Sequence, residues 1–142
     1  MKARSLWILL LSMALPVAAN AQSFTPYPGS TPDQATADAA MKLAGGGTRV
    51  GVYLTADPFE KVAAFYKALY KETKVPGNPL TLPSGEKVKS AYFILDAAKD
   101  LSTSKSWMKV QRPYIGDVVM QGPTPQFKDI RDVTVIETVE KR

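Results

Sequence analysis

The sequence predicts an α+β fold, a two-layer sandwich in which an antiparallel sheet of four or five strands carries one or two helices on one face. The expected order of elements is helix, strand, helix and loop, followed by several strands with short connections. Such runs of strands favour antiparallel pairing with the helices set to one side. The second expected helix also has one wide apolar stripe, which another layer must cover.

The first 21 residues predict a secretory signal peptide. Lys2 and Arg4 precede an apolar run that Pro16 interrupts. Ala19-Asn20-Ala21 then supplies the small residues of a cleavage site. We therefore expect cleavage before Gln22 and a periplasmic or secreted mature protein. The apolar run is shorter than the roughly 20 residues that cross a bilayer, so we expect no integral membrane segment after cleavage.

Composition limits what the mature protein can do. Loss of Lys2 and Arg4 lowers the 18 basic residues to 16, against 13 acidic ones, which leaves a net charge of about +3. Such a charge is too small for a nucleic-acid surface, so no nucleic-acid partner is expected. The chain has no Cys and no His, which excludes disulfides, Ser-His-Asp and Cys-His catalysis, and most metal and haem ligands. We expect no cofactor.

The N-terminal half contains an arm, two helices and a strand. Residues 22–30 predict an extended arm that ends in a turn at Pro28-Gly29, and residues 31–142 predict a single domain. A helix follows over 32–43, with Thr31 as its N-cap, and a glycine run ends it. The alternation of residues 48–55 predicts a strand. Asp57 is the expected N-cap of a second helix that reaches about Glu72.

The C-terminal half predicts a loop and several strands. Prolines keep residues 75–84 irregular, and strands are expected over 87–95 and 106–112. The connection over 96–104 holds a short helical turn, for which Asp96 is the expected cap. A short strand is expected over 118–120, and a closing strand over 130–139 follows a turn at 122–125.

A module within the chain resembles one in small exported bacterial proteins of unknown function. Its parts are the Tyr27-Pro28-Gly29 turn, a following strand, and the helix from Asp57 to Tyr70 with its Phe65-Tyr66-Lys67 triplet. The resemblance covers about a third of the chain. It implies a two-layer α+β fold and no activity.

Two constellations could carry chemistry. Ser102 and Lys105 match the Ser-x-x-Lys pattern of exported penicillin-binding proteins and serine β-lactamases, although the companion motifs are absent. Asp96 and Asp100 could act as an acid–base pair or hold calcium, although calcium needs six or more oxygen ligands. Capping and turn formation explain both pairs without catalysis or a metal, so we expect no enzyme and no metal site.

The predicted binding site is on the strand over 106–112. Alternation points Lys105, Trp107 and Lys109 to one face, and Met108 and Val110 to the core. A ring between cations suits a glycan, an anionic ligand or lipid headgroups. Burial of the indole is the alternative, because tryptophan is usually largely buried. Tyr53, on the polar face of its own strand, would extend this patch if the strands were neighbours.

We therefore expect an exported, non-catalytic binding or interaction domain whose partner is an anionic or glycan-like envelope component or a protein. One alternative is a small periplasmic enzyme that uses Ser102 and Lys105 or Asp96 and Asp100. Another is an accessory subunit of an envelope complex, which would expose a large apolar patch for assembly.

Overall fold

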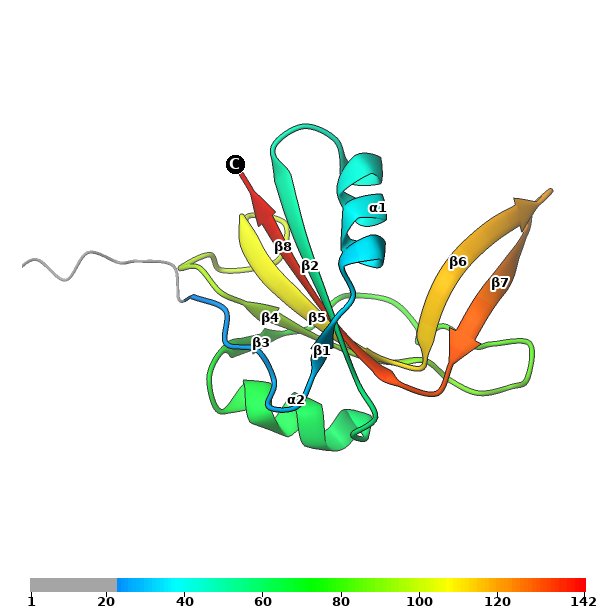
Figure 1. Ribbon diagram of the computed structural model, residues 1–142, viewed down its shortest axis with the longest axis horizontal. Helices are drawn as coiled ribbons and strands as arrows, with labels where there is room; N and C mark the ends of the chain where they lie inside the picture. The colour runs from blue at the N-terminus through cyan, green and yellow to red at the C-terminus, as the bar shows by residue number, and fades with distance from the viewer. Residues whose placement is uncertain (1–22) are drawn as a thin grey trace, which may run out of the picture.

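The computed structural model describes residues 23–142, so the predicted signal peptide lies outside the described residues. This part of the chain is mostly β, with a six-stranded antiparallel sheet, a separate two-stranded ribbon and two helices (Figure 1). The strands are β1 (Thr31–Pro32), β2 (Thr48–Thr55), β3 (Lys71–Thr73), β4 (Lys89–Ile94), β5 (Ser106–Arg112), β6 (Tyr114–Gln121), β7 (Thr124–Arg131) and β8 (Thr134–Lys141), and the helices are α1 (Gln34–Ala44) and α2 (Phe59–Lys67). The predicted antiparallel sheet with helices is confirmed.

The last strand of the chain, β8, lies in the middle of the main sheet. The strand order is β1-β2-β8-β5-β4-β3. Six strands exceed the four or five predicted, because β1 and β3 have only two and three residues, too few to show alternation. The closing strand predicted over 130–139 is in fact two elements, since the chain leaves the ribbon at the end of β7 and enters the main sheet at Thr134.

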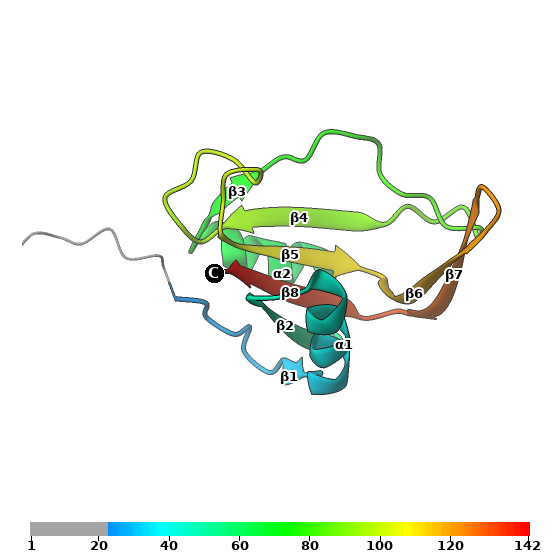
Figure 2. The same ribbon diagram turned by 90° about the horizontal axis from the view of Figure 1, so that it is seen from above.

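The two helices lie on opposite faces of the sheet, which differs from the single helical layer predicted. Adjacent residues in a strand point to opposite faces. Ile136 belongs to the core that contains Val62 and Tyr66 of α2, whereas its neighbour Val135 packs with Ala37 of α1. Figures 1 and 2 show α1 and α2 on either side of the strands. The main sheet therefore lies between two helical layers, of which α1 covers only the β2 side.

Both helices begin later than the sequence predicted. Thr31 is part of β1, where it pairs with Leu54, so Asp33 caps α1 instead and its Oδ1 accepts from Thr36 N–H at 3.1 Å. Asp57 makes no capping bond to α2, whose N-cap is Pro58. The Asp57 carboxylate instead accepts from Tyr27 Oη at 2.6 Å and pairs with Lys61 Nζ at 2.9 Å.

The C-terminal end of α2 also differs from the prediction. The helix ends at Lys67, five residues before Glu72. Residues 71–73 instead form β3, which pairs with β4 at the edge of the sheet. Helix propensity favours a longer helix, but the backbone groups of residues 71–73 gain sheet hydrogen bonds that a continued surface helix would not place beside β4.

The largest core lies between α2 and the sheet and is built around Tyr66. This side chain is fully buried, and four aromatic rings lie with centroids 5.0 to 6.1 Å from it: Phe24, Phe65, Tyr70 and Phe93. Burial and the neighbouring Tyr70 raise the Tyr66 pKa well above its usual value. The phenol is therefore protonated at neutral pH and can donate a hydrogen bond.

The N-terminal segment of residues 23–30 is held on this core by tyrosine hydroxyls. Tyr66 Oη donates to the carbonyl of Thr25 at 3.0 Å, and the Thr25 N–H donates to Tyr70 Oη at 2.8 Å. Tyr70 Oη in turn donates to the carbonyl of Ser23 at 2.9 Å. These bonds satisfy the backbone of a segment that has no strand partner of its own before β1.

Arg112 holds together the chain segments that meet where the ribbon of β6 and β7 leaves the main sheet. Its guanidinium donates to the carbonyls of Ala56 and Asp57 at 3.3 and 3.1 Å, and to Thr134 Oγ1 at 3.1 Å. It also pairs with Asp132 at 2.9 Å. One side chain thus connects the end of β5, the loop before α2 and the start of β8.

The hydrogen bond from Tyr66 can be tested by removing one atom. Tyr66→Phe keeps the ring but leaves the Thr25 carbonyl without its donor, so we expect the free energy of unfolding to fall by about 1 kcal/mol. Urea denaturation measures this change. Tyr92→Phe is the matched control, because within residues 23–142 the Tyr92 hydroxyl has no hydrogen-bond partner, and its effect should stay within about 0.5 kcal/mol. Equal effects of the two variants would contradict the role given to Tyr66.

Candidate functional site

Strand β5 places its side chains on the faces that its alternation predicted. Met108 and Val110 are fully buried in the α2 core. Trp107, Lys109 and Gln111 therefore point to the α1 face, and all three are partly exposed. Figure 2 shows that α1 lies toward the β2 side of this face and does not cover β4 and β5. The indole of Trp107, which the sequence predicted to bind a ligand, is thus neither fully buried nor fully exposed.

Neighbouring strands add two residues to this surface. Tyr92 of β4 pairs with Lys109, and its ring centroid is 6.3 Å from that of Trp107. Glu137 of β8 pairs with Lys109 from the other side. We name Tyr92, Trp107, Lys109, Gln111 and Glu137 the platform. It is a partly exposed patch on three adjacent strands, with two aromatic rings at one end and polar groups beside them.

A groove of about 460 Å³ adjoins the platform at the β4 edge. Ser90, Tyr92 and Gln111 line it from the sheet, and the segment over 72–80 forms its opposite wall. Its prolines, Pro76 and Pro79, keep this wall from forming regular structure beside β4. Tyr92 belongs to both the platform and the groove, so the two form one continuous surface.

The platform has almost no net charge. Lys109 Nζ lies 3.9 Å from Glu137 Oε2, and both side chains are less than one-third exposed. Burial, and then the charge of Glu137, raise the Tyr92 pKa, so its hydroxyl is a neutral donor at physiological pH. Lys105 is exposed at the entry to β5, outside this ion pair. The platform therefore offers hydrogen-bonding groups and ring faces with little net charge.

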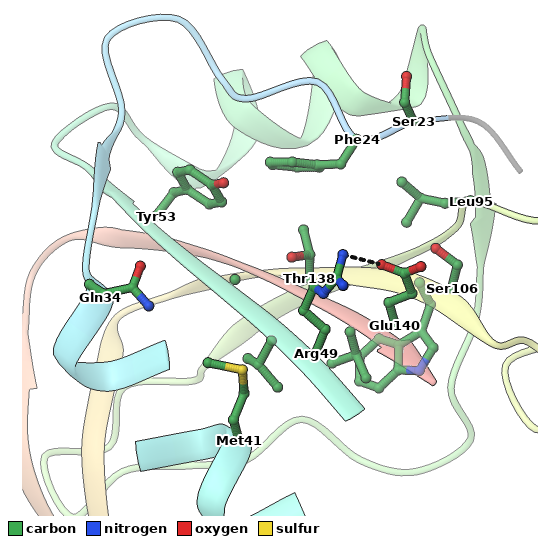
Figure 3. Close-up of a pocket in the computed structure, with 14 residues that line it drawn as sticks. Ser23, Phe24, Gln34, Met41, Arg49, Tyr53, Leu95, Ser106, Thr138 and Glu140 are labelled. Atoms are coloured by element: carbon green, nitrogen blue, oxygen red, sulfur yellow. Dashed lines mark ion pairs between the residues drawn. The ribbon is translucent and has the colours of Figure 1, made fainter. Parts of the chain in front are cut away.

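Tyr53 and Trp107 are not on neighbouring strands, which was the condition for Tyr53 to extend the patch, although both residues line one depression. The two strands are separated by β8, and Tyr53 packs on the α2 core with its ring 5.1 Å from Phe24. In Figure 3, Tyr53 and Phe24 lie on one side of β2 and Met41 of α1 on the other. The depression of about 590 Å³ in that view is lined from both faces around the free end of β2, so it is not a single site on one face. Arg49 and Thr55 make the Tyr53 face of β2 look polar in the sequence, but Tyr53 itself is covered by Phe24 of the N-terminal segment.

Ser102 and Lys105 are not brought together as a catalytic pair. Ser102 Oγ donates to Asp100 Oδ1 at 2.6 Å, and over residues 23–142 no hydrogen bond joins it to Lys105. Thr103 N–H donates to the same Asp100 oxygen at 3.0 Å. This hydrogen bonding shapes the loop and lowers the Asp100 pKa, first through Ser102 and then through Thr103.

Asp96 organises the loop that leads into β5. Its Oδ1 accepts from Ala98 N–H and Ser104 Oγ, and its Oδ2 accepts from the N–H groups of Lys105 and Ser106 at 2.7 and 3.2 Å. Partial burial opposes ionisation, but these four bonds outweigh it and lower the Asp96 pKa. Over the described range, no group of three or more acidic side chains is arranged to hold a metal ion. Asp96 thus positions the residues directly before Trp107.

Sequence reasoning missed Tyr92 and Glu137. A signal for Tyr92 was present, because the strand predicted over 87–95 placed Ala91, Phe93 and Leu95 on one face and Tyr92 on the other. What was missing was the order of strands, which alone places Tyr92 and Glu137 beside Trp107 and Lys109.

When the chain is compared with models of protein families, with curated proteins and with solved structures, none of the three comparisons finds a match. Within residues 23–142, no helix is long and apolar enough to span a bilayer. The function is therefore inferred from the geometry of the site.

The role of Asp96 predicts a pH-dependent stability. Its folded-state pKa is lower than the unfolded value, so its contribution is fully present above pH ~4 and is lost as pH falls through the folded pKa. In either orientation of its amide, Asp96→Asn places an N–H₂ group against at least one backbone donor, which should cost about 1–3 kcal/mol near neutral pH. The variant should also lose part of the acid dependence of stability, measured by thermal unfolding between pH 3 and 7.

Asp100→Asn is the matched control for this experiment. Asp100 uses only Oδ1, an oxygen that asparagine retains, so its variant should be less destabilised than Asp96→Asn. An equal loss in the two variants would mean that negative charge in the loop, and not the paired acceptor geometry of Asp96, stabilises the entry to β5.

Proposed function

We propose that this chain is an exported, non-catalytic binding domain that holds a glycan chain on the platform and in the adjoining groove. The observation that carries the proposal is the Tyr92–Trp107 pair, partly exposed on an uncovered sheet face beside a polar groove. Aromatic faces provide apolar area for the C–H faces of sugar rings, and their polar ends remain available for hydrogen bonds. Export is supported by the sequence of residues 1–21.

The platform favours a neutral glycan over an anionic one. The positive charge of Lys109 is already compensated by Glu137 at 3.9 Å. The hydrogen-bonding groups of the platform are therefore this ion pair, the amide of Gln111 and the phenol of Tyr92. Lys105 lies at the edge, where it can contact an occasional acidic substituent. A glycan with many hydroxyl groups can satisfy such a mixture of donors and acceptors, whereas a polyanion would face Glu137.

The shape of the surface supports binding of a chain and not of a compact ligand. The groove is open to solvent along the β4 edge, and the platform continues from it across three strands. Small-molecule sites usually bury most of their ligand in a concave pocket. A surface that is open to solvent and continues over three strands instead suits several successive sugar units, each of which makes a few weak contacts.

The absence of a catalytic role is supported by the bonding of the candidate residues. Ser102 donates to Asp100, and Asp96 is engaged by four donors of its own loop. A general base needs to reach the proton that it removes, and these groups are already engaged in shaping the loop before β5.

Affinity electrophoresis tests the proposal. The protein is run in native gels that contain a soluble neutral polysaccharide, such as hydroxyethyl cellulose, or an anionic one, such as alginate. We expect retardation by the neutral polymer. Trp107→Ala should weaken the affinity by about tenfold, equivalent to about 1.4 kcal/mol, because it removes the larger ring.

Leu69→Ala is the matched control, since Leu69 is an exposed apolar residue that follows α2 on the far side of the sheet. It should leave the retardation unchanged. Far-UV circular dichroism should show that both variants are folded. If only alginate retards the protein, the ligand is anionic and not a neutral glycan. If Trp107→Ala and the parent protein are retarded equally, the platform is not the binding site.

A further inference from the structure

The ribbon of β6 and β7 is a second surface with exposed apolar side chains. It projects away from the main sheet (Figure 1), and we name its outer part, residues 116–129, the arm. Val118, Val119 and Met120 of β6 are 49%, 38% and 60% exposed. Phe127, which pairs with Val118, is also partly exposed. A two-stranded ribbon is marginally stable in water. Val118 and Met120 point to one face of the ribbon together with Phe127, whereas Val119 points to the other, and the shared face is an exposed apolar surface.

The base of the ribbon, in contrast, is firmly attached. Tyr114 is buried with the α1 core, and Arg131 lies over its ring at 4.2 Å. Arg112 and Asp132 join the two chain segments where the ribbon leaves the domain. The arm is therefore presented in a defined direction, although its outer residues make few contacts with the rest of the chain.

The two edges of the arm differ in their ability to pair with another strand. Pro125 has no N–H, so its nitrogen must face away from β6, as must the backbone groups of Phe127 and Asp129 at the same alternation. The β7 edge is thus blocked at Pro125, and it is distorted at Asp129, whose φ is 52°. Natural sheets use such features to prevent edge pairing.

The β6 edge carries no such protection. Met120 and Val118 are the partners of Pro125 and Phe127, so the backbone N–H and C=O groups of Gly116, Val118 and Met120 face outward. None of these residues is proline or charged. The β6 edge is therefore unprotected at Gly116, Val118 and Met120. The outer strands of the main sheet, β1 and β3, have only two and three residues.

We propose that two copies of this chain associate by antiparallel pairing of their β6 edges, which forms a four-stranded ribbon from two arms. A two-fold axis at Val118 lets this residue exchange both backbone hydrogen bonds with its own copy. The same register places Gly116 opposite Met120 at both ends, where the Asp129 side chain of the arm already lies over Gly116. A second copy thus supplies hydrogen-bonding complementarity to the β6 edge.

Charge is compatible with this pairing. The single charged residue of β6 is Asp117, which faces Lys128 within its own arm. In the register centred on Val118, Asp117 lies opposite Val119 of the other copy, so no like charges meet directly. The pairing extends each two-stranded arm into a four-stranded sheet. Val118, Met120 and Phe127 lie on one face of this sheet, and the apolar side chains of the two copies meet there at the two-fold axis.

Sedimentation velocity of the whole protein, measured over a concentration series, tests this association. We expect a monomer–dimer equilibrium. Val118→Lys should weaken dimerisation by at least about tenfold, because a lysine at this edge opposes pairing without removing a β6–β7 hydrogen bond.

Ile130→Lys is the matched control. Ile130 is 43% exposed, and its replacement by lysine adds the same charge as Val118→Lys. Ile130 lies on β7, however, whose edge is blocked. It should leave the dimer intact. A monomer at all concentrations, or equal weakening by the two variants, would overturn the proposal.

Amide hydrogen exchange measured by NMR identifies the pairing mode and remains informative if Val118→Lys disturbs the arm. In the parent protein, the N–H groups of Gly116, Val118 and Met120 should exchange rapidly at low concentration and become protected as the dimer forms. A dimer without this protection would exclude the β6 edge. This result is independent of glycan binding, which concerns a different face of the domain.

Discussion

The central position of β8 is the constraint on which the rest of the structure depends. All eight residues of β8 pair with β2 on one side. Six of these eight residues also pair with β5 on the other side. Without it, the N-terminal strand β2 and the strands β5 and β4 would have no common sheet. Because these pairings join the two ends of the sequence, the fold forms only when the whole domain is present, and contacts of such long range make folding slow relative to helical proteins.

The same strand divides the interior into two cores. Ile136 contributes to the aromatic core around Tyr66, whereas Val135 and the α1 residues form the smaller core on the other face. A helix is about 10 Å wide, and α1 covers only the strands nearest to β2. The remaining α1 face, over β5 and β4, is therefore left uncovered, and its side chains must tolerate water. Partly exposed aromatic and polar residues satisfy this requirement and at the same time form the surface on which we propose that a glycan binds.

Two surfaces with different physical character follow from this architecture. The platform is rigid, because its residues stand on the central strands of the sheet and the loop before β5 is fixed by Asp96. The arm is anchored at its base, where Arg112 pairs with Asp132 and Tyr114 is buried in the α1 core. Such an arrangement would let a dimer present two platforms, so that one glycan chain could contact both. Linked weak sites bind more tightly than either alone when the ligand can span them.

The amino-acid sequence by itself determined the local features. Alternation identified the buried Met108 and Val110 and placed Trp107 on the other face, and the apolar stripe identified α2. It could not identify β1 and β3, which are too short for a period of two residues to be visible, nor the neighbours of any strand. Tyr53 was therefore grouped with Trp107, and Tyr92 and Glu137 were left out. Only the tertiary structure decided the strand order, the opposite placement of the two helices and the unprotected edge of β6. The physical reason is that side-chain periodicity reports which face of a strand is buried, whereas pairing depends on residues far apart in the chain.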